Sequence, residues 1–273
     1  MKETIILPKR SWLRIDFREM LQYKDLFYFL ALRDVKVRYK QTAIGILWAF
    51  FVPIISMVIF TVFFGNLAQI DSSGAPYPIF VYVGLVFWLF FSQALSSASG
   101  SLVSDQEMIK KIYFPRLILP SSTVIVAFID FLIASSILCA MMFYYQFVPK
   151  PISLFLIPIL ILITYFTSLG MGLFLSAVNV KYRDVRYIIP FFIQMLLFLT
   201  PVIYPAKIAG EKYQWILNLN PMSGVIENAR AIIIGNTPIN LESLAMSIGI
   251  SILLFIVGLF YFRKTEQKFA DVV

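Results

Sequence analysis

Six long apolar runs divide this chain, and they limit what it can fold into more than any other feature. They cover residues 42–64, 77–99, 121–146, 152–178, 187–206 and 243–262. About 20 helical residues rise roughly 30 Å, the thickness of a membrane's hydrocarbon layer, so each run is long enough to cross it. Because 60% of the residues are hydrophobic and 14% are charged, too few polar side chains remain to cover a water-soluble fold. We expect an all-α polytopic membrane protein with six transmembrane helices.

The basic residues predict how these helices are oriented. Of the 23 Lys and Arg residues, 19 lie in the N-terminal segment, in loops 100–116 and 179–186, or after residue 262, and the other four lie in the alternate gaps. Cytoplasmic loops of membrane proteins carry such an excess of Lys and Arg. We therefore expect a multi-pass membrane protein with both termini in the cytoplasm. The net charge of +8 is explained by this distribution, so nucleic-acid binding is not expected.

Residues 1–41 form the first of two expected domains, and residues 42–273 form the second. The first alternates apolar and basic side chains, a pattern typical of helix that lies in the inner headgroup layer with its basic groups reaching toward phosphates. Within it, Asp34 and Arg38 have the i,i+4 spacing of a helical ion pair. We expect a cytoplasmic interface segment followed by a six-helix membrane domain.

The loop between the second and third apolar runs predicts a short helix. Ser104 and Glu107 have the spacing of a capping box, and the Phe114-Pro115 pair should end the helix after Lys111. A stiff helix that protrudes from the membrane offers a partner protein a surface to bind. The same residues could instead be the frayed end of a long transmembrane helix, and their spacing does not decide between the two.

A second helix is expected outside the six spans, between the fifth and the sixth. Asn220 and Pro221 make a helix start and Gly235 a helix stop, which predicts a helix at about 221–234. It is too short and too polar to cross a membrane. We expect it to dip into the outer leaflet, with Glu227 and Arg230 at i,i+3 and able to pair.

Several kinds of chemistry are missing from the sequence. No Gly is followed by Lys, so there is no phosphate-binding P-loop, and the chain is not expected to be an enzyme or to bind a cofactor itself. With Cys139 as the single Cys and no His, neither an internal disulfide nor a transition-metal site is expected. Asp130 is the one charge within the six runs, and we favour a hydrogen-bonded or protonated packing residue over a transport residue.

Aromatic and small side chains suggest two further roles within the spans. Aromatic rings can stack on the C–H faces of sugars without holding them tightly, although lipid contact is the ordinary role of such residues. The candidates for a substrate channel are Trp48, Phe51, Phe80, Phe87, Trp88 and Phe91. A stripe of small residues at every fourth position of the fourth span should let another helix pack closely. Its members are Thr164, Ser168, Gly172 and Ser176.

Four stretches in order resemble the ABC-2 type permeases of bacterial polysaccharide exporters, in particular the O-antigen and wall teichoic acid group. The first runs from Leu32 through Arg38 and Lys40 to Gly45 and Trp48. The others are Ile109–Arg116 with Leu119-Pro120, Asn179–Asp184 followed by Pro201–Pro205, and Leu219–Met222. The resemblance covers nearly the whole chain, from about residue 25 to residue 262.

The resemblance implies a homodimer that associates with two separate P-loop ATPase subunits, which bind the ATP and Mg²⁺. Together they would move a lipid-linked polysaccharide, such as O-antigen or teichoic acid, outward through a channel between the permeases. In this family two inner segments touch the ATPases, and here they correspond to 25–41 and 104–116. The candidate coupling residues are Arg33, Asp34, Glu107, Lys110, Lys111, Tyr113 and Arg116.

Two more groups of site residues follow from the same resemblance. Arg38 and Lys40 at the inner rim are candidates to contact the lipid diphosphate. The short outer helices act as an exit gate in this family, here at about 206–235 with Pro221, Glu227 and Arg230. Three alternatives remain open: an ABC-2 exporter of a small lipid or drug, an ion-driven carrier that works without an ATPase, and a structural membrane scaffold.

Overall fold

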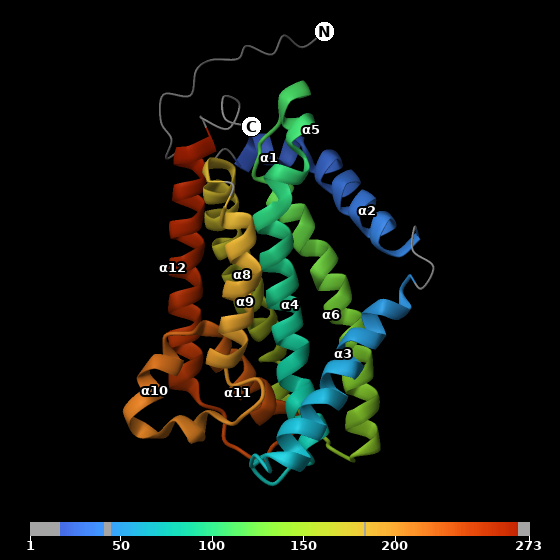
Figure 1. Ribbon diagram of the computed structural model, residues 1–273, viewed down its shortest axis with the longest axis vertical. Helices are drawn as coiled ribbons and strands as arrows, with labels where there is room; N and C mark the ends of the chain where they lie inside the picture. Colours follow the sequence, from blue (N-terminus) through green and yellow to red (C-terminus); the bar gives the residue numbers. More distant parts are fainter. Residues whose placement is uncertain (1–16, 41–44, 183, 267–273) are drawn as a thin grey trace.

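The chain forms an elongated helical bundle in the computed structural model (Figure 1). The structure describes residues 17–40, 45–182 and 184–266, and within these ranges every regular element is a helix. Residues 1–16 of the predicted interface segment, the predicted start of the first span at 42–44, and the end of the chain after residue 266 lie outside the described residues. The all-α fold expected from the sequence is confirmed.

Five helical stretches in the described residues are long and apolar enough to cross a membrane. The first is α3 (Leu47–Phe60), continued by the π-helical η1 (Thr61–Leu67). The second and third are α4 (Tyr77–Ser104) and α6 (Ile118–Tyr144). The fourth joins α7 (Pro151–Leu154) to α8 (Ile157–Lys181), and the fifth is α12 (Leu241–Glu266). They correspond to predicted spans one to four and six.

The predicted fifth span, 187–206, is only partly helical. Its helix is α9 (Val185–Leu199), whose 15 residues rise about 22 Å, less than the thickness of the hydrocarbon layer. Thr200 is extended and Pro201 follows, which ends the helix because proline supplies no backbone N–H. The chain then turns through residues 200–205 inside the protein. The apolar run therefore contains a short helix followed by a buried turn.

The shorter helices lie at the two ends of the bundle (Figure 1). At one end are α1 (Phe17–Gln22), α2 (Lys24–Lys40), α5 (Gln106–Lys111) and the last turn of α12. We call this the basic end. At the other are η2 (Ala206–Ala209), α10 (Gly210–Asn218) and α11 (Pro221–Ile233). We call this the α11 end.

Small residues bring the central helices α4, α8 and α12 close together. The stripe predicted on the fourth span is buried, and a Cβ on Gly172 would lie 2.6 Å from the Cβ of Ala98 on α4. Where α8 touches α12, a Cβ on Gly258 of α12 would lie 2.0 Å from the carbonyl oxygen of Gly170 on α8. Because any side chain at these glycines would push the backbones apart, the stripe's predicted packing role is confirmed.

The helix α3 packs very differently from α4. In the most apolar part of the α3–η1 stretch 6% of the residues are buried within the protein, whereas in the most apolar part of α4 78% are buried. Figure 1 shows α3 crossing beside α4 and α6 at an angle, away from α8 and α12. Most of the surface of α3 is therefore available to lipid or to another protein chain.

Candidate functional site

At the basic end, α2 is joined to the α4–α5 corner by an arginine. Arg33 on α2 donates through Nη1 and Nη2 to the two carboxylate oxygens of Asp105, at 2.8 and 3.1 Å, and through Nε to Asp34 at 2.9 Å. The hydrogen bond to Asp105 is the main reason that the pKa of Arg33 is raised. A two-pronged guanidinium–carboxylate contact fixes orientation as well as distance. Movement of α2 would therefore be passed to α4 and α5.

The short helix α5 lies where the sequence predicted it, but it has no capping box. Its N-cap residue is Asp105, which makes no side-chain capping hydrogen bond. The reason is that α4 remains helical through Ser104, and the carboxylate of Asp105 is bound to Arg33. The predicted capping box is wrong, whereas the predicted end of the helix at Lys111 is confirmed.

The coupling residues predicted on and after α5 divide into exposed and anchored positions. Glu107 and Lys111 are exposed and paired at 3.2 Å, and Lys110 is exposed beside them. Tyr113 is also exposed, and its carbonyl accepts a hydrogen bond from Tyr23. Arg116 instead is bound to Glu266 at the end of α12. The structure therefore presents α5 as a surface and uses Arg116 to hold the following turn.

One turn further along α2, Arg38 and Tyr39 bind the single charge of the apolar runs. Nη2 of Arg38 lies 2.6 Å from Oδ2 of Asp130, and the hydroxyl of Tyr39 donates to Oδ1 of Asp130. The predicted ion pair between Asp34 and Arg38 is wrong, because Asp34 pairs with Arg33. Asp130 is therefore hydrogen-bonded, which is one of the two states expected for a packing residue, whereas the choice between a packing and a transport role stays a prediction. Sequence reasoning did not find its partners, which lie about 90 residues away along the chain.

A cavity of about 350 Å³ opens beside this cluster, between α2, α3, α4 and α6. Its lining includes Arg38, Tyr39, Asp130, Trp48 and Gln93. One end is therefore charged and the remainder is largely apolar. Such a lining suits an amphipathic ligand, with a polar group at the charged end and apolar surface along the rest. Lys40, the other predicted diphosphate contact, is exposed on the last turn of α2.

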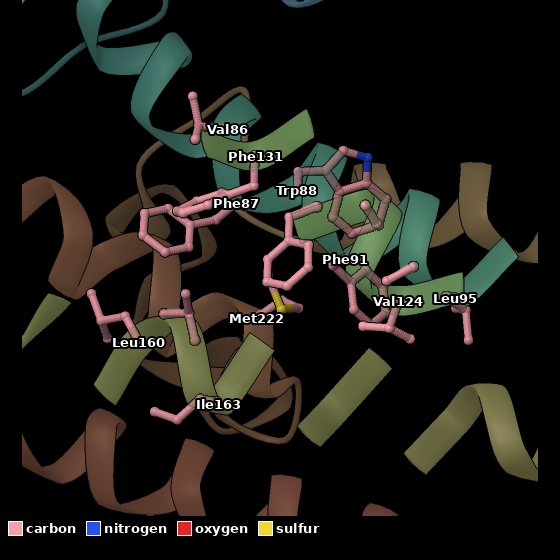
Figure 2. Packing of buried hydrophobic residues seen from close by; sticks show 14 of the residues in the cluster. Val86, Phe87, Trp88, Phe91, Leu95, Val124, Phe131, Leu160, Ile163 and Met222 are labelled. Atoms are coloured by element: carbon pink, nitrogen blue, oxygen red, sulfur yellow. The ribbon is translucent and has the colours of Figure 1, made fainter. Parts of the chain in front are cut away.

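The aromatic channel candidates separate into two groups. Trp48 and Phe51 lie together on α3, with ring centroids 6.4 Å apart, and are 57% and 44% exposed. The other four are less than 5% exposed, because α4 is enclosed by its neighbours. They are Phe80, Phe87, Trp88 and Phe91. Figure 2 shows three of them, Phe87, Trp88 and Phe91, packed among buried side chains. In this protomer the four form core, and only the α3 pair faces open space.

At the α11 end, a buried arginine closes the turn that follows α9. Nη1 and Nη2 of Arg230 donate to the carbonyl oxygens of Pro201 and Val202, at 2.7 and 2.6 Å, and Nε donates to that of Phe80 at 3.1 Å. The guanidinium also lies 3.6 Å from the ring centroid of Phe80. Burial lowers the pKa of Arg230 to about 9, which still leaves it charged at neutral pH. Arg230 therefore ties α11 to α4 and to the 200–205 turn.

The helix start predicted at Pro221 is confirmed, and the ion pair that the i,i+3 spacing would allow between Glu227 and Arg230 is not formed. Oδ1 of Asn220 accepts a hydrogen bond from the backbone N–H of Met222 at 3.0 Å, and Gly235 has a φ of +78° just after the helix. Arg230 donates to backbone carbonyls instead of Glu227. Residue spacing did not reveal this, because carbonyl acceptors carry no side-chain signal.

A polar cavity of about 520 Å³ lies at the same end. It is bounded by the 72–73 turn, η2, α10, α11 and the 234–241 segment. Glu227, Lys207 and Gln214 line it, together with side chains of the 236–240 loop. Among the residues that the structure describes, no group of three His, Cys, Asp or Glu side chains could hold a metal ion.

The fold defines a multi-pass helical membrane protein with charged and polar sites at its two ends and beside the middle of α6. The chain belongs to the ABC-2 type transporter family, which matches residues 25–234. The membership expected from the four sequence stretches is confirmed. The shared region includes all the elements described above from α2 to α11.

Curated relatives are similar along nearly their whole length. An O-antigen export system permease protein RfbA of Klebsiella pneumoniae is 26% identical over 249 residues, 91% of this chain and 95% of the relative. One of the same name from Myxococcus xanthus is 27% identical over 257 residues, 93% of this chain and 97% of the relative. The polysialic acid transport protein KpsM of Escherichia coli is 24% identical over 249 residues, 87% and 92% of the two chains.

Proposed function

We propose that this chain is the permease subunit of an ATP-driven exporter that moves a lipid-linked polysaccharide out of the cytoplasm. The observation that carries the proposal is its similarity, over nearly the full length, to permeases named for O-antigen and polysialic acid export. The substrates in these names differ, and a long glycan is what they share. The substrate class therefore follows from the relatives, while the particular sugar does not.

The energy for export is supplied by other subunits in this proposal. The sequence has no P-loop of its own, so two P-loop ATPase subunits bind the ATP and Mg²⁺. They dock at the basic end, which the distribution of Lys and Arg assigns to the cytoplasm together with both termini. The exposed surface of α5 and the Arg33–Asp105 contact support this placement. ATP-driven movement of α5 would reach α2 through that contact.

The substrate path is proposed to lie between two copies of the chain. The exposed α3, with Trp48 and Phe51, would face the path. The cavity beside Asp130 would receive the lipid diphosphate, with Arg38 and Lys40 as its contacts. Arg38 is paired with Asp130 in this structure, so a diphosphate would bind by replacing that carboxylate on the guanidinium. Polyphosphate oxygens suit this exchange because guanidinium binds them in two-pronged fashion.

Reconstitution tests the central claim. The chain is placed in vesicles alone, or together with the ATPase of the same bacterium, and movement of the lipid-linked glycan is measured with and without ATP. We expect translocation only with both proteins and ATP. Translocation by the chain alone would overturn the proposal in favour of an ion-driven carrier. Movement of a small lipid but of no glycan would favour the small-molecule exporter.

A surface variant tests where the ATPase docks. Glu107→Ala with Lys110→Ala on α5 should weaken copurification of the ATPase and lower export, without lowering the amount of folded permease, because both side chains are exposed. Lys264→Ala is the matched control, since it removes an exposed charge from α12 at the same end. Equal copurification of the α5 variant and the control would place the docking surface elsewhere.

A further inference from the structure

The polar cavity at the α11 end has the properties of a ligand site. Its volume of about 520 Å³ falls within the roughly 300–1,000 Å³ range of small-molecule pockets. Its walls come from four separate parts of the chain: the 72–73 turn, the η2–α10 segment, α11 and the 234–241 segment. They are held in place by Arg230, as described above, and by Asn228, which binds Gly224, Asn240 and Ser243. The cavity therefore has a fixed frame.

Several polar side chains that line this cavity take no part in the hydrogen bonds that hold its walls together. Glu227 is partly buried, and among the described residues no hydrogen bond or ion pair within 4 Å engages its carboxylate. Burial raises its pKa, against the opposing effect of Arg230 and Lys207. Lys207 and Gln214 are exposed at the cavity, Thr237 is partly buried, and within the same described set none of their side chains makes a hydrogen bond to protein. The cavity thus offers a carboxylate acceptor, an ammonium donor, and two groups that donate and accept.

We propose that this cavity binds a neutral, hydroxyl-rich sugar segment of the glycan as it leaves the membrane. The inference rests on the proposed function and adds a binding site on the exit side. Sugar hydroxyls donate and accept at once, so they match a mixed set of carboxylate, amide, hydroxyl and ammonium groups. Pro205, Pro238 and Ile239 add apolar surface to the lining, against which a C–H face of a sugar ring can pack.

Other ligand classes fit the cavity less well. Arg230 is committed to backbone carbonyls, so the charges left in the lining, Glu227 and Lys207, balance. A strongly anionic group would meet the carboxylate of Glu227, and a hydrocarbon chain would leave the polar groups unpaired. No metal-holding group of three side chains is present among the described residues. A neutral polar ligand satisfies the most groups.

Protection from a thiol reagent tests whether glycan visits the cavity. Cys139→Ser removes the native thiol, and Gln214→Cys places a new one in the cavity lining. Tyr213→Cys is the matched control, because Tyr213 is the preceding residue of α10, is exposed and does not line the cavity. Cells in which the exporter and its ATPase are active are treated with a membrane-impermeant maleimide, with glycan synthesis either active or blocked. We expect severalfold slower labelling at 214 when glycan is made, and no change at 213.

The outcomes separate this inference from the proposed function. Equal labelling at 214 in both conditions, with surface glycan still exported when the ATPase is active, would overturn the exit site and leave the exporter standing. Equal labelling at 214 in both conditions, together with normal surface glycan in cells that lack the permease, would contradict both the exit site and the proposed export function. Protection at both 213 and 214 would also overturn the site, since it would mean general shielding of this end.

A substitution supplies a second readout that is independent of labelling. Glu227→Ala should slow export about fivefold, the effect of one lost hydrogen bond, whereas Glu227→Gln keeps an acceptor oxygen and should restore part of the rate. Both variants are checked for folded yield by size-exclusion chromatography. A rate equal to the wild type in a folded Glu227→Ala protein would contradict a role of this carboxylate in sugar binding.

Discussion

The two helices α3 and α4 are both apolar enough to cross a membrane, yet their surroundings are opposite. The stretch formed by α3 and η1 is the more hydrophobic of the two, but only 6% of its most apolar part is buried within the protein, against 78% for α4. The more hydrophobic helix is the more exposed one. In a membrane, lipid tails are as apolar as leucine, so hydropathy reports that a helix is in the bilayer and not what it touches.

The packing of α4 depends on features that α3 lacks. Ala98 on α4 meets Gly172 on α8 at close range, the amide of Asn179 donates to the carbonyl of Ser99 at 3.1 Å, and Arg230 binds Phe80 at the other end. Small residues and polar contacts hold membrane helices together where the hydrophobic effect does not. The comparison separates a rigid core around α4 from a surface helix that is free to contact lipid, substrate or a second copy.

The largest expected effect contrasts an aromatic residue on each helix. Phe87→Ala should destabilise the protein by about 4 kcal/mol, because the ring lies 5.3 Å from that of Phe131 and its removal leaves a cavity. Phe51→Ala and Trp48→Ala should change stability by less than about 0.5 kcal/mol and lower glycan export. Thermal unfolding in detergent and surface-glycan assays measure the two effects. A large stability loss at Phe51 would remove the distinction between the two helices.

The next prediction concerns the contact that anchors α4 at the α11 end. Arg230→Ala should destabilise the protein by about 3 kcal/mol, because the buried carbonyls of Phe80 and Val202 lose their donor. Arg230→Lys should recover only part of this, since an ammonium lacks the planar fork of donors. Unfolding temperature and folded yield provide the measurement. Wild-type stability of Arg230→Lys would show that charge alone is sufficient.

A smaller effect is expected where α8 and α12 touch. Gly258→Ala should cost about 2 kcal/mol, because the new methyl group would overlap the carbonyl of Gly170. Gly249→Ala on the same helix is the matched control, since a Cβ there meets nothing within 4 Å. The two unfolding temperatures are compared directly. Equal values would mean that the backbones of α8 and α12 can separate freely.

The smallest expected effect lies between α2 and α6, beside α3. A double-mutant cycle of Arg38→Ala and Asp130→Ala should give a coupling energy of about 0.5–1 kcal/mol, because the guanidinium is partly exposed to water. The cycle is measured on unfolding free energy. A coupling of zero would indicate that the pair does not hold α2, and a much larger value would place this region with the rigid core.

Apart from the capping box at Ser104, sequence reasoning succeeded where the signal is local and failed where the partner is distant. Asn220, Pro221 and Gly235 act through neighbouring backbone, and the helix that they predict is present. The pairs considered at i,i+3 or i,i+4 spacing for Asp34 and Glu227 are absent, because Arg38 binds Asp130 on α6 and Arg230 binds backbone carbonyls 28 to 150 residues away. Spacing along one helix does not show which other helix competes for the same side chain.

The candidate site was predicted only in part, for the same reason. Exposed charges on α5 were predicted from a protruding loop and are exposed. Four of the six aromatic candidates, by contrast, are buried in the core around α4. The polar cavity at the α11 end was not predicted, because Glu227, Lys207 and Gln214 come from different elements and form no motif.

The sequence by itself determined that this chain is a helical membrane protein, where most of its long helices lie, and which family it resembles. These properties depend on the length of the apolar runs, the distribution of charges and the local order of residues, all of which are visible in the linear sequence. Only the tertiary structure decided which helix is core, which partner each arginine binds, and where cavities open. Those outcomes depend on contacts between distant segments, and in an apolar solvent the residues that face lipid and those that face protein look alike.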